Sequence, residues 1–278
     1  MGALKSLISF YTIFHMNITQ DDMDSMEKKF YLTPLVGLVF GFIALLAISI
    51  LDFLEIRFGF GNVLVMAVIL LLIPYVGSKF LHFDGLTDFG DGMIVSGEQS
   101  DHIRALKDTL VGAGGIGVAL ITVLCSFACY TMYDARASAI LLLPAVEILV
   151  KNAMVVAASF GKPGNGMAAR QVEKTTGKSA VLGCIVTIAA VLLLFVVTGL
   201  ILMLVPASFS WEGMLMLWAP PIVAGFIVSI IVGFIMARTA NRVFGMVNGD
   251  ILGATNEVAR PFLLFFMILV FAMVTEML

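Results

Sequence analysis

Charged residues are scarce in this sequence, since Asp, Glu, Lys and Arg make up only 13% of its 278 residues. In soluble domains these four residue types account for about a quarter of the chain, so the composition excludes an ordinary soluble protein. The net charge of -3 and the scatter of the 16 basic residues argue against nucleic acid as a partner. With 60% hydrophobic residues and a mean hydropathy of +1.07, the chain is predicted to be an integral membrane protein.

Cysteine is also scarce, and Cys125, Cys129 and Cys184 all fall in apolar runs. We expect them to pack as small hydrophobic side chains rather than to form disulfides or bind metal. The first apolar run is too long for a signal peptide and lacks a small-residue cleavage pattern, so no cleaved targeting segment is expected. No internal repeat is visible. Residues 1–278 are therefore predicted to form a single polytopic membrane domain.

Long apolar runs dominate the chain. A helix of about 20 apolar residues crosses a hydrocarbon core of about 30 Å. Residues 1–20 have apolar side chains at helical spacing, which predicts a short amphipathic helix in the membrane interface, and a polar link from Asp21 to Lys29 completes this N-terminal segment. The predicted fold is all-α, with about seven transmembrane helices near residues 30–54, 60–81, 110–133, 137–160, 179–205, 214–237 and 251–276.

Lys and Arg are retained on the cytoplasmic side of membrane proteins, so their distribution predicts orientation. Only Arg57 and Arg136 fall in the loops of one side. The segments of the other side contain Lys5, Lys28, Lys29, Lys79, Arg104, Lys107, Lys162, Arg170, Lys174, Lys178, Arg238 and Arg242. A multi-pass protein of the cell membrane with a cytoplasmic N-terminus is therefore expected. The same distribution places the stretch after His82, the 161–178 loop and the 238–250 connection together on the cytoplasmic face.

The stretch from His82 to Gly92 reads H-F-D-G-L-T-D-F-G-D-G and follows an apolar run. If it is helical, the spacing of Asp84, Asp88 and Asp91 puts three carboxylates on one face, where they repel unless a divalent cation lies among them. Oxygen ligands favour hard ions, and Mg²⁺, which shares substrate phosphates, is the ordinary choice. His82 could bind the metal, transfer a proton or form a hydrogen bond. The alternative is a solvated loop of turns and helix caps.

The polar region continues to Lys107 and Asp108, on a helix expected from Gln99 to Leu110. Directly after it, residues 112–117 read G-A-G-G-I-G and open the third predicted span. These glycines could expose backbone N–H groups to a phosphate at a helix N-terminus. Alternatively, they only permit close helix packing.

Charged residues also occur inside the fourth predicted span, where Glu147 and Lys151 lie four residues apart. They either neutralise each other as a structural ion pair or line a polar cavity. The following loop, 161–178, is the most basic in the chain and includes Lys162 and Arg170. It is either a positive-inside anchor or a binding site for a polyanionic substrate.

The last predicted span opens with several polar residues. Asp250 and Glu257 are seven residues apart and therefore share a helix face, with Asn256 beside Glu257. Polar residues in the first turns of a span are expected to point inward, toward a hydrated cavity. Pro261 is expected to kink this helix.

Four segments resemble one known family. F-L-H-F-D-G-L-T-D-F-G-D-G resembles the motif H-x-D-G-L-x-D-x-x-D-[AG] of cobalamin synthases, the adenosylcobinamide-GDP ribazoletransferases. K-D-T-L-V-G-A-G-G-I-G is similar to their next conserved segment, T-P-L-V-G-L-V-F-G at 33–41 to their first-span signature, and G-D-I-L-G-A-T-N-E at 249–257 to their C-terminal motif. One departure is that Glu147 and Lys151 lie where members commonly have a Ser-Arg pair.

The resemblance implies a Mg²⁺-dependent transferase that joins α-ribazole, or its 5′-phosphate, to adenosylcobinamide-GDP. The products are adenosylcobalamin, or its 5′-phosphate, and GMP. The implied catalytic residues are His82, Asp84, Asp88 and Asp91. The implied metal ligands are Asp84, Asp88, Asp91 and Asp108. The implied substrate-binding residues are Lys107, Lys162, Arg170, Asp250, Asn256 and Glu257. As partners we expect these small molecules and membrane lipid; a homo-oligomer, or association with other corrinoid-pathway enzymes, is compatible with the sequence.

Two other functions remain as alternatives. D-F-G-D-G satisfies the start of the D-x-x-D-G signature of CDP-alcohol phosphotransferases, but the residues after it do not continue that signature. An ion-coupled secondary transporter would use carboxylates within the membrane. Against a transporter, the charges are expected to gather at one membrane face, and the sequence shows no repeat.

Overall fold

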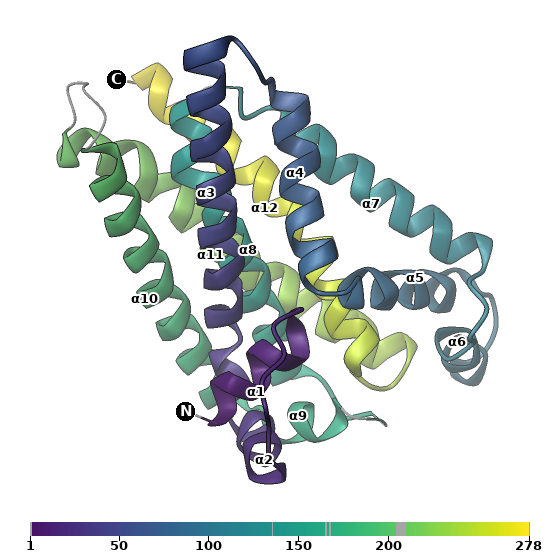
Figure 1. Ribbon diagram of the computed structural model, residues 1–278. Helices are drawn as coiled ribbons and strands as arrows, with labels where there is room; N and C mark the ends of the chain where they lie inside the picture. Colours follow the sequence, from purple (N-terminus) through teal and green to yellow (C-terminus); the bar gives the residue numbers. More distant parts are fainter. Residues whose placement is uncertain (1, 135, 165, 167, 204–209, 278) are drawn as a thin grey trace.

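The computed structural model describes residues 2–134, 136–164, 166, 168–203 and 210–277, and these described residues are organised in helices without a β-strand (Figure 1). The predicted all-α fold is therefore confirmed. The elements are α1 (Gly2–Tyr11), α2 (Gln20–Lys28), the 3₁₀-helix η1 (Phe30–Leu32), α3 (Pro34–Phe58), α4 (Val63–Gly77), α5 (Leu81–Ile94), α6 (Gln99–Leu106), α7 (Ala113–Thr131), α8 (Arg136–Phe160), α9 (Ala169–Lys174), α10 (Gly177–Leu202), α11 (Trp211–Val243) and α12 (Gly249–Met277).

Six helices are long and apolar enough to cross a membrane, namely α3, with η1 before it, and α7, α8, α10, α11 and α12. They match six of the seven predicted spans, although α11 continues to Val243, beyond the predicted end at residue 237. The predicted end of the fifth span, residue 205, lies outside the described residues, as do residues 165 and 167 of the basic loop. In Figure 1 the two chain termini lie at opposite ends of the bundle.

The second predicted span, 60–81, is wrong at its C-terminal end. Helix α4 has 15 residues, which gives a length of about 22 Å, less than the hydrocarbon thickness of about 30 Å. The chain then bends by 91° into α5. Lys79 and Phe80 produce this bend with φ angles of 56° and 59°, in the left-handed region that non-glycine residues rarely adopt. As a result, the acidic stretch is a helix that packs against α7 and α12.

Helix α8 lies at the centre of the bundle. It packs against α3, α10, α11 and α12, and its most apolar 18-residue window is completely buried. A helix that is buried on all sides has no lipid-facing surface, so its charged side chains must find partners inside the protein. This position explains why Glu147 and Lys151 belong to an internal network, which is described below.

The N-terminal region forms two helices. Helix α1 confirms the expected short helix, but the predicted polar link is wrong, because α2 occupies most of it. Thr19 and Asp22 form a capping box that starts α2, which explains why a polar segment folds as a helix. Helices α1 and α2 pack against each other and lie at the same end of the bundle as α5 and α9 (Figure 1). Helix α6 ends at Leu106, four residues before the expected end.

Candidate active site

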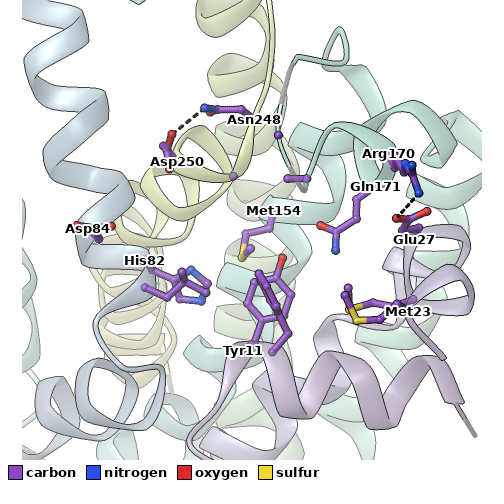
Figure 2. Close-up of a pocket in the computed structure, with 16 residues that line it drawn as sticks. Tyr11, Met23, Glu27, His82, Asp84, Met154, Arg170, Gln171, Asn248 and Asp250 are labelled. Carbon is purple, nitrogen blue, oxygen red and sulfur yellow. Dashed lines mark hydrogen bonds and ion pairs between the residues drawn. The ribbon is translucent and has the colours of Figure 1, made fainter. Parts of the chain in front are cut away.

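A cavity of about 660 Å³ lies where α1, α2, α5, α9 and the start of α12 meet (Figure 2). The expected convergence of three polar segments is confirmed, because α5, the 161–178 loop and the connection before α12 all contribute to it. Helices α1 and α2 form the remaining side of the cavity, and the sequence did not predict that they would contribute to it. Its polar lining consists of Tyr11, Glu27, His82, Asp84, Arg170, Gln171, Asn248 and Asp250.

Backbone hydrogen bonds tie two of these segments together. Pro163 and Val247 form an isolated parallel β-bridge, in which the Val247 N–H donates to the Lys162 carbonyl at 2.7 Å and the Gly164 N–H donates to the Val247 carbonyl at 3.2 Å. The Lys162 N–H donates to Oδ1 of Asn241 at 2.7 Å. Polar backbone groups of both loops are therefore satisfied within the protein, and the loop before α9 is fixed beside the start of α12.

The carboxylates of α5 face the start of α12. A Cβ atom at Gly85 would lie 2.6 Å from the carbonyl oxygen of Asp250, so only glycine permits this approach of the two helices. Burial, followed by the negative charges of Asp250, Asp84 and Asp91, raises the pKa of the Asp88 carboxyl to about 7. We call Asp84, Asp88 and Asp250 the carboxylate group of the site. Without a cation, the neighbouring carboxylates disfavour the ionised form of Asp88.

Asp91 has a different partner from the one expected. Its carboxylate accepts hydrogen bonds from the backbone N–H of Gly112 at 2.6 Å and of Gly115 at 2.7 Å, at the N-terminus of α7. A Cβ at Gly115 would lie 2.5 Å from the Thr87 carbonyl oxygen. The glycine segment therefore serves close packing of α5 against α7. The N–H groups of Gly112 and Gly115 are taken by Asp91 rather than left for a phosphate.

The described side chains do not form a complete metal-binding cluster by themselves. Within the part of the chain that the structure describes, no three His, Cys, Asp or Glu side chains form a group that could hold a metal ion. Of the four expected ligands, Asp91 caps α7, and Asp108 is exposed and accepts a hydrogen bond from the Leu110 N–H at 3.0 Å. The carboxylate group still offers an all-oxygen donor set. It fits Mg²⁺ bound through one or two carboxylates, with waters and substrate phosphates as further ligands.

His82 is held on two sides. Its ring, 2% exposed, stacks on Tyr11 with 5.6 Å between ring centroids, and its Nε2 lies 2.6 Å from Nζ of Lys151. Burial, and then the positive charge of Lys151, lowers the pKa of His82 well below its usual value, so the imidazole is neutral at pH 7. Because a lysine ammonium only donates hydrogen bonds, we assign Nε2 as the acceptor and place the imidazole proton on Nδ1.

A chain of buried polar groups continues from Lys151 into the bundle. Lys151 Nζ donates to Oδ1 of Asn256 at 2.8 Å, and Asn256 Nδ2 donates to Oε1 of Glu257 at 2.8 Å. Glu257 Oε2 lies 3.5 Å from Nε of Arg260, and Arg260 forms a buried ion pair with Glu147. We call these five residues the internal network. Two positive and two negative charges offset one another there.

The internal network corrects three expectations. Glu147 pairs with Arg260 and not with Lys151, so the self-contained pair within the fourth span is wrong. Asn256 and Glu257 lie outside the described lining of the cavity; Asn256 contacts Lys151, and Glu257 contacts Asn256. The charges also extend into the interior of the bundle and do not gather at one face alone. The position of the charges therefore no longer argues against a transporter.

The basic residues separate into two groups. Arg170 lines the cavity, and its guanidinium lies 3.8 Å from the carboxylate of Glu27. Lys174 also pairs with Glu27, at 2.5 Å. By contrast, Lys107 and Lys162 are exposed and lie outside the described lining. Of the three expected phosphate-binding residues, only Arg170 is therefore placed at the cavity.

Several lining residues were not identified from the sequence. Tyr11 follows the apolar spacing of the first helix, and no local pattern connected it with His82. Glu27 lies in an acidic segment whose charge complements the basic 161–178 loop, and this complementarity was a usable signal. Gln171 and Asn248 lie next to expected site residues. The Asn248 amide donates to Oδ2 of Asp250 at 2.7 Å and orients it.

Comparisons with known proteins agree in pointing to one family. Residues 3–268 match the family described as "Cobalamin-5-phosphate synthase". A protein of Methanocella arvoryzae is 32% identical over 267 residues, covering 94% of this chain and 92% of the relative. A protein of Methanosarcina barkeri is 28% identical over 280 residues, covering 93% and 88%. Both relatives carry the name adenosylcobinamide-GDP ribazoletransferase. No solved structure matches the chain.

Proposed function

Because this chain belongs to the cobalamin-5-phosphate synthase family, we propose that it is an adenosylcobinamide-GDP ribazoletransferase. Its substrates are adenosylcobinamide-GDP and α-ribazole or the 5′-phosphate of α-ribazole. Its products are adenosylcobalamin, or the corresponding 5′-phosphate, and GMP. The observation that carries the proposal is that Asp84 and Asp250 of the carboxylate group lie on the wall of a cavity that also contains His82, while Asp88 is coupled to both through their negative charges.

The reaction is a displacement at phosphorus. A ribose hydroxyl oxygen of α-ribazole bonds to the phosphorus that carries cobinamide, and the bond from that phosphorus to the oxygen of the GMP phosphate breaks. The hydroxyl proton passes to a base, and GMP leaves with the bonding electron pair. Such transfer depends on positioning and on neutralising phosphate charge more than on covalent chemistry with the protein.

The carboxylate group would hold Mg²⁺, which, when bound, neutralises phosphate charge during the transfer. The raised pKa of Asp88 supports this assignment, because a cation would relieve the repulsion among the carboxylates. Asp91 contributes indirectly, since it fixes α5 to the N-terminus of α7.

His82 has a distinct role. Its neutral ring has a proton on Nδ1, so it donates a hydrogen bond to a phosphate oxygen or to the ribose. The contact with Lys151 occupies Nε2 and fixes the plane of the ring. Arg170 lines the cavity and lies 3.8 Å from Glu27, and its side chain is 66% exposed. It can therefore also reach a substrate phosphate and neutralise its charge. Lys107 and Lys162 are exposed at the same end and would act on phosphates only through the general positive field.

We also propose that the active site faces the cytoplasm and that the protein resides in the cell membrane. The distribution of Lys and Arg supports this orientation. Helices α1, α2 and α9, which contribute residues to the cavity, lie at one end of the bundle (Figure 1). A single cysteine placed in the exposed turn at Asp108, in a chain without its three native cysteines, tests the orientation. It should react with a membrane-impermeant thiol reagent only after the cells are opened.

The enzymatic proposal is tested with purified protein in detergent. With Mg²⁺, adenosylcobinamide-GDP and α-ribazole, mass spectrometry should detect a cobalamin and an equal amount of GMP. Turnover in detergent requires no ion gradient, so it separates an enzyme from a transporter. Absence of these products, together with turnover of a CDP-alcohol donor, would contradict the proposal.

A further inference from the structure

The cavity has two chemically different walls. One wall carries the carboxylates of Asp84 and Asp250 together with His82. The other wall comes from α1 and α2 and presents Phe10, Met23 and Met26 beside the ion-paired Glu27, and Met154 of α8 lies between the two walls (Figure 2). Figure 2 shows Asp84 and Asp250 on one side of the cavity and Met23 on the other, with Tyr11 and Met154 between them. A ligand with one polar part and one apolar aromatic part fits such a division.

Size limits which substrate enters. Cavities of roughly 300–1,000 Å³ hold drug-sized ligands, and a cavity of about 660 Å³ accommodates a nucleoside. Adenosylcobinamide-GDP carries a corrin ring, an adenosyl group and a nucleotide, and it is far larger than a nucleoside. Only its reacting phosphates need to reach the carboxylate group. The corrin therefore stays outside the cavity.

We call the side of the cavity formed by Phe10, Met23 and Met26 the apolar wall. Two aromatic bases are candidates to bind there, the dimethylbenzimidazole of α-ribazole and the guanine of GDP. Guanine has an edge of donors and acceptors, and burial of that edge without partners is unfavourable. The carboxylate of Glu27, which would otherwise suit guanine, is paired with both Arg170 and Lys174. Dimethylbenzimidazole instead presents two methyl groups, which suit flexible thioether side chains.

We propose that the base of α-ribazole binds against Phe10 and Met23 of the N-terminal helices, with its ribose directed toward the carboxylate group. The corrin of the second substrate remains outside the cavity. The N-terminal helix pair is thus the part of the chain that selects the nucleoside. This inference rests on the proposed ribazoletransferase function.

The test measures equilibrium binding by calorimetry, with α-ribazole and GDP titrated separately into the purified full chain. Met23→Ala should weaken α-ribazole binding about tenfold, because part of the apolar wall is lost, while GDP binding stays unchanged. Met23→Gln, which keeps the chain length and adds a polar amide, should act in the same direction if Met23→Ala does not fold. Met23→Leu should stay close to wild type. Met16→Ala is the matched control, because Met16 is 41% exposed and lies outside the described lining.

Two outcomes would overturn the inference. Weaker GDP binding in Met23→Ala, with unchanged α-ribazole binding, would place guanine at the apolar wall. Unchanged binding of both ligands would show that the N-terminal helices do not contact either base. Failure of the proposed function gives a different result. A wild-type protein that binds α-ribazole but forms no cobalamin would contradict the proposed reaction without contradicting the binding site for the base.

Discussion

Lys151 Nζ lies 2.6 Å from His82 Nε2, and both side chains are at most 2% exposed. Lys151 comes from the central helix α8 and His82 from the helix that follows the bend at Lys79 and Phe80. The contact therefore connects the wall of the cavity with the interior of the bundle. Buried charges of this kind are unfavourable unless they are partnered, and here each has a partner in the internal network.

The first prediction concerns Lys151. Replacing it by Met removes the donor that fixes the His82 ring, so kcat should fall roughly 10- to 100-fold while both KM values change little. Steady-state kinetics with purified protein gives both quantities. Lys178→Met, which alters an exposed lysine, is the matched control and should behave as wild type.

A double-mutant cycle distinguishes positioning from a general loss of structure. If Lys151 acts through His82, then adding Lys151→Met to His82→Ala should lower the residual kcat no further. If the fold-losses in kcat of the two single variants multiply in the double variant, the two residues act independently.

The second prediction concerns the ion pair between Glu147 and Arg260, whose side chains are 3% and 0% exposed. Glu147→Ala removes the carboxylate nearest to the buried Arg260 guanidinium, leaves only Glu257 as a charged partner among the described residues, and should lower the free energy of unfolding by about 3 kcal/mol. The double variant Glu147→Met/Arg260→Met should recover most of that loss, because hydrophobic side chains of similar size replace both charges. Thermal unfolding in detergent measures the effect. A double variant as unstable as the single one would contradict this explanation.

The third prediction concerns pH. The pKa of Asp88 is raised to about 7, so this carboxyl is protonated below that pH and carries its charge above it. Protons then compete with Mg²⁺, and the Mg²⁺ concentration that gives half-maximal activity should rise about tenfold from about pH 8 to about pH 6. In Asp88→Asn, which cannot titrate, the residual activity should lose this dependence. A pH-independent Mg²⁺ requirement in the wild type would exclude Asp88 as a ligand.

The fourth prediction concerns the phosphorylated substrate. The Arg170 side chain is 66% exposed and lines the cavity, so it should bind the 5′-phosphate of α-ribazole 5′-phosphate. Arg170→Ala should raise KM for α-ribazole 5′-phosphate up to about tenfold, the lower part of the range for charged hydrogen bonds, because solvent screens the charge. KM for unphosphorylated α-ribazole should stay constant. Arg238→Ala, at another exposed arginine, is the control; equal effects on both substrates would contradict the role.

Apolar length was sufficient to predict six membrane-crossing helices, because a helix that crosses hydrocarbon must be long and apolar. The same criterion failed between residues 60 and 81, where Ser78 and Lys79 interrupt the apolar run only briefly before it resumes at Phe80 and Leu81. The left-handed conformations of Lys79 and Phe80 depend on the packing of α5 against α7 and α12. Tertiary structure therefore decides where α4 ends.

The position of the cavity was predictable in part, because His82 and Asp84 of the acidic stretch line it. Partners that are distant in sequence were not predictable. Local spacing allowed a pair between Glu147 and Lys151 as one of two interpretations, whereas Glu147 pairs with Arg260, 113 residues away. Tyr11 and His82 are also far apart in the chain, and only the tertiary structure brings their rings into contact.

In the proposed reaction, the carboxylate group holds Mg²⁺ for phosphoryl transfer. The most direct measurement is the rate of GMP release from adenosylcobinamide-GDP and α-ribazole, with saturating Mg²⁺, for wild type and Asp88→Asn. Asn keeps the size of the side chain and removes its charge, so the account predicts a folded protein whose GMP release falls at least about 100-fold. Wild-type rates in Asp88→Asn would contradict the account.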